Sequence, residues 1–315
     1  MRAQSSATTA TTIAVTAPRE HRSFGIGMAA LGVTAFSLTF PSTAWGLESF
    51  GPWSLVAVRS VLAALVAGGC LLGVGVPPRE RSRAWGRVPL PDRRHLPGLA
   101  VVAAGVVFGF PLLTTLALQT STTSHAAVVV GLLPLTTAAC SALRTGHRPS
   151  RRFWLAALAG AAAVLAFTVG QSGGSLTAAD GYLFAALLVC AAGYTEGGRL
   201  ARVMPGWQVI GWALVLSLPL SLPAALLALS YEPVHFTWHG VTGLLWVSVV
   251  SQFLGLVVWY RGMAAIGIPK ASQLQLAQPL LTLVWSALLL GEHLTAAAPL
   301  TAVAVLVCIA VTQRS

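Results

Sequence analysis

Ten apolar runs of about twenty residues each follow one another along this chain. A helix of twenty residues is roughly 30 Å long, which matches the hydrocarbon thickness of a bilayer. Helices are the expected form because the bilayer core offers an unpaired peptide group no hydrogen-bond partner. The runs cover residues 24–44, 53–76, 97–118, 124–143, 153–170, 181–200, 207–229, 240–260, 270–290 and 296–312. The sequence therefore predicts an all-α polytopic membrane protein with ten transmembrane helices.

The composition agrees with this class of protein. Hydrophobic residues make up 56% of the chain and charged residues 9%, and the mean hydropathy is +0.77. A soluble domain carries about 25% charged residues, so a soluble enzyme is excluded. The formal net charge of +11 would suggest a nucleic-acid partner for a soluble protein. In a membrane protein basic residues collect in the cytoplasmic loops, so no nucleic acid is expected as a partner.

The basic residues divide between the two sides of the membrane. With the N-terminus in the cytoplasm and ten spans, 18 of the 19 Lys and Arg residues fall on the cytoplasmic side. The nineteenth, Arg59, lies inside the second run, and the outer loops contain acids but neither Lys nor Arg. The preference for Arg over Lys suggests a bacterial genome rich in G and C. We expect a multi-pass protein of the bacterial cytoplasmic membrane, with both termini in the cytoplasm and residues 1–22 as a disordered tail.

The chain also contains an internal repeat. A shift of 145 positions aligns Pro279 with Pro134 and Gly291 with Gly146, and eight of the 21 positions from 126 to 146 match their counterparts. Each copy holds five runs, and because five is odd the second copy must cross the membrane in the opposite sense. Inverted repeats are typical of transporters whose halves open in turn to either side. We expect repeats at 23–172 and 179–313; a duplication without a mechanistic role is the alternative.

These features resemble the drug/metabolite transporter superfamily, EamA type. The resemblance rests on the runs, the repeats, the proline within the fourth and ninth runs, and the ending LLLGE at 288–292, and it covers roughly residues 24–313. Gly291-Glu292 fits the Gly-Glu pair that commonly ends the repeat in that family, whereas the first copy has Gly146-His147. The resemblance implies an exporter or exchanger of amino acids, drugs or small metabolites, with a central cavity between the halves. The expected partners are a small-molecule substrate and the lipid bilayer, with a homodimer left open.

The ninth run carries polar side chains that lipid cannot satisfy. Gln275, Gln278 and Thr282 lie at i, i+3 and i+7 and share one helix face, and Pro279 frees a backbone carbonyl beside them. They are expected to line a substrate cavity or, alternatively, to form hydrogen bonds between helices. The further candidates for substrate binding are Gln252, Trp259, Tyr260, Tyr194 and Ser37.

Two charged side chains inside the runs are candidates for coupling or gating. Glu196 is the only acid within a run, and a buried carboxylate is costly enough to suggest a proton-coupling or cation site. Its alternative is an interfacial pair with Arg199 or Arg202. Arg59 could bind an acid or a substrate carboxylate; its alternatives are snorkelling to the outer interface or hydrogen bonds to carbonyls of the first helix.

His125 and Lys270 are equivalent at the shift of 145, and each opens a helix, on opposite faces of the membrane. We expect them to be gate residues. The alternatives are a surface cap for His125 and the ordinary enrichment of cytoplasmic loops in basic residues for Lys270.

No cofactor, metal site or catalytic group is expected. The four cysteines lie far apart in separate apolar runs, without a CxxC pair, and QSGGS at 171–175 is not followed by the GK[ST] of a phosphate loop. The sequence therefore predicts a secondary transporter that works by alternating access and is not an enzyme. A membrane-embedded lipid-modifying enzyme and a passive channel are the alternatives.

Overall fold

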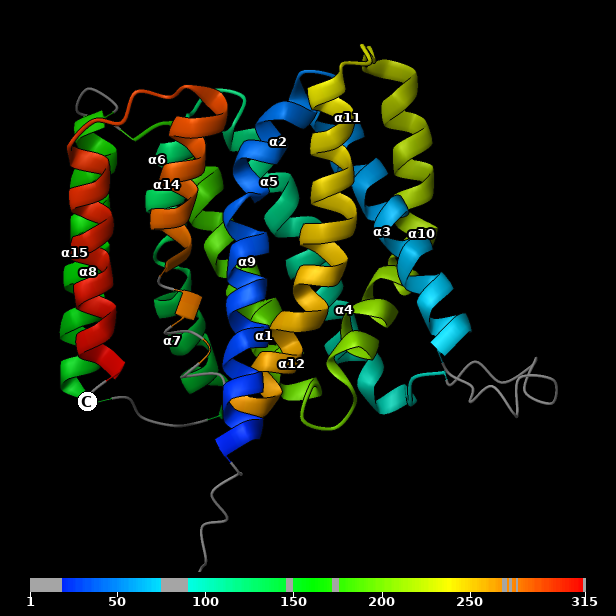
Figure 1. Ribbon diagram of the computed structural model, residues 1–315, viewed down its shortest axis with the longest axis horizontal. Coiled ribbons are helices and arrows are strands. Elements are labelled where there is room, and N and C mark those ends of the chain that lie inside the picture. The colour runs from blue at the N-terminus through cyan, green and yellow to red at the C-terminus, as the bar shows by residue number, and fades with distance from the viewer. Residues whose placement is uncertain are drawn as a thin grey trace, which may run out of the picture.

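The computed structural model describes residues 19–74, 90–145, 150–171, 176–267, 271, 274–275 and 277–313, and this part of the chain is helical without strands (Figure 1). The helices of the first half are α1 Arg19–Ser37, α2 Thr39–Leu47, α3 Pro52–Val74, η1 Arg93–His95, α4 Leu96–Val102, η2 Ala103–Gly109, α5 Phe110–Ala117, α6 Thr123–Val130, α7 Leu133–Thr145 and α8 Arg151–Gln171. Those of the second half are α9 Ala178–Leu200, α10 Gly206–Tyr231, α11 Trp238–Leu245, η3 Trp246–Gly255, α12 Leu256–Ile266, α14 Ala277–Leu290 and α15 Ala297–Gln313.

Seven helical segments of the described chain are long and apolar enough to cross a membrane. They are residues 23–47, 52–73, 93–117, 123–144, 178–200, 206–231 and 238–266. Three shorter apolar helices, 158–170, 277–290 and 297–307, fall on the predicted fifth, ninth and tenth runs. The prediction of an all-helical, multi-pass membrane protein is therefore confirmed, and every predicted run contains a helix.

Several of these segments are built from more than one helix. Between α6 and α7 the chain turns at Gly131 and Leu132, and Pro134 follows at the start of α7. Proline has no N–H to donate to the carbonyl four residues earlier, so the regular ladder of hydrogen bonds cannot continue through this point. In η2 and η3 the chain adopts π-helical geometry, which is rare and is often found at functional sites. Shifted by 145 positions, η2 corresponds to residues 248–254, which lie inside η3.

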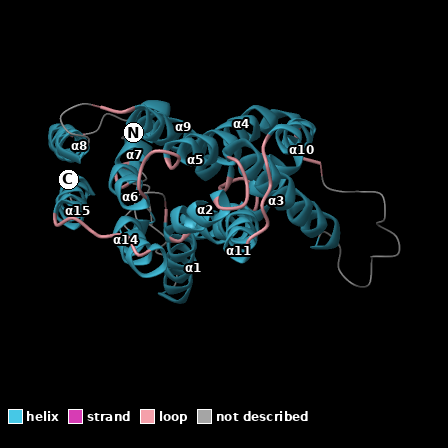
Figure 2. Cartoon of the chain, turned by 90° about the horizontal axis from the view of Figure 1, so that it is seen from above, coloured by secondary structure: helices cyan, strands magenta, loops and turns pink. Residues whose placement is uncertain are grey.

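The helices pair in a pattern that relates the two halves. In the neighbour pairs, α3 packs against α10, α8 against α15, α6 against α14, α1 against α12, and α9 against α4, η2 and α5. Each run of the first half has a counterpart five runs later in the second half. If every run is swapped with its counterpart, the same pairs of neighbours result. The α8–α15 pair and the α3–α10 pair lie at opposite ends of the molecule (Figure 1), and the other helices lie between them when the molecule is seen from above (Figure 2).

Close packing of η2 against α9 depends on glycine. A Cβ atom added at Gly105 would lie 2.3 Å from the carbonyl oxygen of Val189 and 3.1 Å from the backbone of Gly193. No real side chain fits at such distances, so the two backbones touch only because Gly105 and Gly193 have none. Such contacts between small residues are a common way to join helices in membranes.

Candidate functional site

Arg59 lies in a buried polar cluster in the N-terminal third of α3, with 4% of its surface exposed. Its Nε donates a hydrogen bond of 2.6 Å to Oε1 of Gln252, and its Nη2 donates one of 3.0 Å to the carbonyl oxygen of Val247. The Gln252 amide nitrogen in turn donates to the carbonyl oxygen of Val107 at 3.2 Å and to the Ser60 hydroxyl at 3.4 Å. The side chain therefore neither snorkels to the outer interface nor bonds to the first helix.

The two backbone acceptors of this cluster belong to the two π-helical segments. Val107 lies in η2 and Val247 in η3, one from each half of the chain. A π turn departs from the regular α-helical bonding, and here one carbonyl of each π segment accepts a hydrogen bond from a side chain. Residue patterns do not reveal where a helix widens into a π turn, so these acceptors could not be predicted from the sequence.

A small central cavity of about 40 Å³ adjoins the cluster. A cavity of this size holds a few water molecules at most and is far smaller than the several hundred Å³ of a typical ligand pocket. Its polar lining residues come from both halves of the chain: Thr39, Arg59, Tyr194, Ser251, Gln252 and Gln278. Thr39 and Ser251 are joined through their hydroxyl groups at 2.7 Å. Aromatic rings form much of the remaining wall, and those of Phe40 and Phe110 stack with their centroids 6.4 Å apart.

Gln275 and Gln278 of the ninth run do not line the same cavities. Gln278 lines the central cavity and also a void of about 10 Å³ between α6, α7 and α14, whereas Gln275 lines only that void. Within the described chain neither polar atom of the buried Gln275 side chain has a hydrogen-bond partner, and Oε1 of Gln278 also has none. The expected hydrogen bonds between helices are therefore not made by these atoms, and Gln278 is the residue with access to the centre.

Three other predicted binding residues lie outside the central cavity. Trp259 and Tyr260 are buried in α12; Trp259 meets Phe36 edge to face, with centroids 6.1 Å apart, and Tyr260 packs against Gly197 and Gly206. The Ser37 hydroxyl accepts a hydrogen bond of 3.0 Å from the Trp285 indole, and its carbonyl accepts one of 2.8 Å from Thr282. Ser37 thus fastens α14 to α1. All three pack helices together, although the Trp259 indole nitrogen and the Tyr260 hydroxyl have no hydrogen-bond partner among the described residues.

Glu196 forms ion pairs near the end of α9. Its Oε1 lies 2.7 Å from Nε of Arg144, and its Oε2 lies 2.8 Å from Nε of Arg199. The Arg199 pair was one of the predicted alternatives. The Arg144 pair was not, because 52 positions separate the partners and nothing local links them. The carboxylate joins α9 to α7 and does not line the central cavity.

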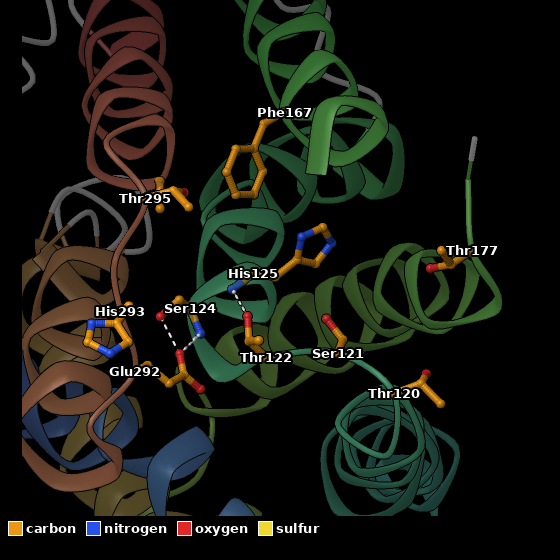
Figure 3. A pocket seen from close by; sticks show the side chains of 11 residues that line it. Thr120, Ser121, Thr122, Ser124, His125, Phe167, Thr177, Glu292, His293 and Thr295 are labelled. Carbon is orange, nitrogen blue, oxygen red and sulfur yellow. Dashed lines mark hydrogen bonds between the residues drawn. The ribbon is translucent and has the colours of Figure 1, made fainter. Parts of the chain in front are cut away.

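A larger pocket of about 370 Å³ opens where the loop before α6 meets the loop between α14 and α15 (Figure 3). Glu292 reaches across from the second half and accepts hydrogen bonds from the backbone N–H groups of Thr123 at 2.9 Å and Ser124 at 3.0 Å. Both hydroxyls of these residues also donate to it. A helix N-terminus carries partial positive charge and unpaired N–H groups, so the carboxylate is well placed there. The sequence reading noted Glu292 only as part of the Gly-Glu ending.

His125 lies in the wall of this pocket, as Figure 3 shows. We call it the outer pocket because the topology predicted from the sequence puts the loop before α6 on the outer side. Its Nε2 is 2.7 Å from a carboxylate oxygen of Asp180, and its ring stacks on Phe167 with centroids 5.4 Å apart. Asp180 also accepts from the backbone and hydroxyl of Thr177 in a capping box at the start of α9. His125 thus connects α6 of the first half to α9 of the second. Its predicted counterpart, Lys270, lies outside the described residues.

Comparisons with known proteins agree on the kind of protein. Residues 23–169 and 177–313 each match the EamA-like transporter family. A protein of Bacillus subtilis strain 168, named as the uncharacterized transporter YdeK, is 42% identical over 287 residues, which are 90% of this chain and 95% of that protein. A solved crystal structure shares the fold with a TM-score of 0.61 and 20% identity, covering 94% of this chain and 96% of the other. Since the family matches twice and spans nearly the whole chain, this protein belongs to the EamA-like transporter family.

Proposed function

We propose that this protein is a secondary transporter that moves a small organic solute across the bacterial cytoplasmic membrane by alternating access, as an exporter or exchanger. The observation that carries the proposal is the central cavity, whose polar lining comes from both halves of the chain, with Arg59 from α3 and Gln252 from η3. A site shared by two related halves can be opened to one side or the other when the halves rock against each other.

The proposed architecture is ten transmembrane spans in two inverted repeats, residues 23–172 and 179–313, with both termini in the cytoplasm. Two observations support this architecture. The pairs of neighbouring helices stay the same when the two halves are swapped, and η2 and η3 lie at corresponding positions of the two halves. Labelling with a membrane-impermeant maleimide tests the topology. In a protein without native cysteines, Ser121→Cys at the outer pocket should be labelled in intact cells and Arg202→Cys should not. The reverse pattern would contradict the topology.

In this proposal the structure corresponds to a state closed on both sides. The central cavity holds at most a few water molecules. On the outer side, Glu292 at the N-terminus of α6 and His125 beside Asp180 each connect one half to the other, and we assign the outer gate to these contacts. Lys270 is proposed as the corresponding residue on the cytoplasmic side. Glu196, held by two arginines, is proposed to anchor α7 to α9 there rather than to carry protons.

Transport by the purified protein in proteoliposomes tests the function. We expect uptake or counterflow of at least one solute from a panel of amino acids, organic acids and cationic drugs, with a rate that saturates. Gln278→Leu should slow this transport. Leu226→Ala, at an exposed position of α10, is the control and should leave the transport rate unchanged. Flux that rises in proportion to concentration would favour a passive channel instead.

A further inference from the structure

We propose that Arg59 is the binding group for the carboxylate of a monoanionic organic acid in the central cavity, an inference that rests on the transport function proposed above. The first step is the charge of this side chain. A guanidinium group stays protonated in proteins, and Arg59 is 96% buried because only 4% of it is exposed. Burying a charge without an opposite charge is costly, so an unneutralised guanidinium needs an explanation.

The described part of the chain supplies no such opposite charge. The partners of Arg59 are the neutral Gln252 amide and the Val247 carbonyl, and no described carboxylate forms an ion pair with it. These two hydrogen bonds use Nε and Nη2. The third nitrogen, Nη1, makes no hydrogen bond to any described residue, and Arg59 lines the cavity. The guanidinium is therefore held from one side and has donors left for a ligand on the other.

The remaining lining of the cavity selects against positive charge on the ligand. None of the described residues that line it is acidic, so an ammonium group would find no counter-ion among them and would be repelled by Arg59. The uncharged polar side chains of the lining are Thr39, Tyr194, Ser251, Gln252 and Gln278, and the rings of Phe40 and Phe110 provide apolar surface. A carboxylate on an apolar or aromatic body fits this combination, and a zwitterion or a cationic drug does not.

The number of charges also limits the anion. Among the described residues that line the cavity, Arg59 alone is basic, and its partners on the protein side are neutral. One guanidinium can pair with one carboxylate in a planar, two-point contact. A phosphate group carries close to two negative charges at neutral pH and would remain half neutralised here. The geometry therefore favours a monocarboxylate over a phosphate ester.

Calorimetric titration of the purified, detergent-solubilised full chain tests this assignment with matched ligands. The first series is 3-phenylpropionate, its amide, the corresponding amine, and phenylalanine, which differs from the acid only by its ammonium group. Butyrate, butyramide and butylamine form an aliphatic series, and phenyl phosphate is the competing anion. In at least one series the acid should bind roughly 10- to 100-fold more tightly than its amide, as expected for a charge-assisted contact. The amines, phenylalanine and phenyl phosphate should bind more weakly than the acid.

Variants separate ligand binding from a structural role. Arg59→Gln keeps hydrogen-bond donors without the charge, so it should abolish the preference for acid over amide while affinity for the amide stays within about threefold. Arg94→Gln removes the same charge from an exposed side chain that pairs only with Asp92, and it should keep the preference. If Arg59→Gln does not insert into the membrane, the test uses Arg59→Lys and the wild-type ligand series. Lys keeps the positive charge, so Arg59→Lys should keep a weakened preference for the acid over the amide.

Three results would overturn the assignment: acids that bind no better than their amides in both series, a preference that survives in Arg59→Gln, or tighter binding of an amine, phenylalanine or phenyl phosphate. Transport assays in proteoliposomes distinguish a wrong carboxylate assignment from a wrong transport function. Saturable transport of a neutral or cationic solute that the acids do not inhibit would reject the carboxylate site and leave the transport function standing. Binding of acids at Arg59 without saturable transport of any solute would reject the transport function alone.

Discussion

The central cavity and the outer pocket treat their charged groups in opposite ways. In the central cavity, Arg59 has only neutral partners among the described residues and retains a nitrogen without a hydrogen bond. In the outer pocket, Glu292 receives four hydrogen bonds from the start of α6, and His125 is paired with Asp180. A charge that the protein leaves unneutralised is available to a ligand, whereas a charge that the protein satisfies holds helices together.

This difference predicts two separate consequences of substitution. Changes at the centre should alter ligand affinity and transport more than stability, because the partners there are few. Changes at the outer pocket should alter stability and the balance between conformations, because each carboxylate joins the two halves. Measuring both quantities for each variant tests the comparison directly.

The largest effect is expected for removal of the central charge. Arg59→Met should lower the apparent affinity for transported carboxylates about 100-fold, and Arg59→Lys about 10-fold, because Lys keeps the charge but loses the planar two-point contact. Transport in proteoliposomes with variants that insert at wild-type levels measures this. If Arg59→Lys and Arg59→Met lowered the apparent affinity equally, the positive charge would not contribute to binding. The contrast between the central cavity and the outer pocket would then be wrong.

The next largest effect is expected at the outer pocket. Glu292→Gln keeps the shape but removes the negative charge from the N-terminus of α6, so it should reduce stability by about 1–3 kcal/mol. Glu48→Gln is the control, because Glu48 is half exposed and meets only His239 at 3.5 Å; it should change stability by less than about 0.5 kcal/mol. Denaturation in detergent measures both. Similar values for the two variants would remove Glu292 from the proposed gate.

A smaller effect is expected for the glutamines. Gln278→Leu should weaken substrate affinity by about tenfold, which corresponds to about one hydrogen bond in the central cavity. Gln275→Leu should leave affinity unchanged and raise stability slightly, because neither polar atom of this buried amide has a partner among the described residues. A loss of affinity in Gln275→Leu alone would show that the void beside it belongs to the substrate path.

The smallest effect is expected at Glu196, near the C-terminal end of α9. Glu196→Gln weakens pairs with two arginines that are themselves about half exposed, so it should reduce stability by about 1 kcal/mol or less. The transport rate should vary with pH in Glu196→Gln as it does in the unmodified protein. Loss of that dependence in Glu196→Gln, with Glu48→Gln as a control that retains it, would make Glu196 a coupling residue after all.

Many features of the fold could be predicted from the sequence because they depend on local patterns. Runs of about twenty apolar residues indicated where helices lie, and Pro134 and Pro279 exposed the repeat at a shift of 145. The exact bounds were less certain: the eighth predicted run ends at residue 260, whereas α12 continues to Ile266. The π-helical form of η2 and η3 could not be predicted, because both segments have residues that would equally suit a regular transmembrane α-helix.

The candidate site could be predicted only as a set of residue types. Arg59, Gln252, Gln278 and Tyr194 were named from the sequence because lipid cannot satisfy their polar groups, and the structure brings them to one cavity. Trp259, Tyr260 and Ser37 were named by the same reasoning, yet they lie in packed contacts outside it. Composition alone cannot distinguish these outcomes, since a buried polar group is satisfied equally well by a neighbouring helix or by a cavity.

A helical membrane protein built from two related halves can be recognised from the sequence, because hydrophobic runs and an internal repeat are patterns of nearby or aligned residues. Which charges are satisfied depends instead on how the helices pack. Gln252 lies 193 positions from Arg59, Glu292 lies 169 positions from Thr123, and Arg144 lies 52 positions from Glu196. Partners so distant meet only when the packing of the helices sets their depth and rotation, and that packing depends on contacts along the whole chain rather than on any local pattern.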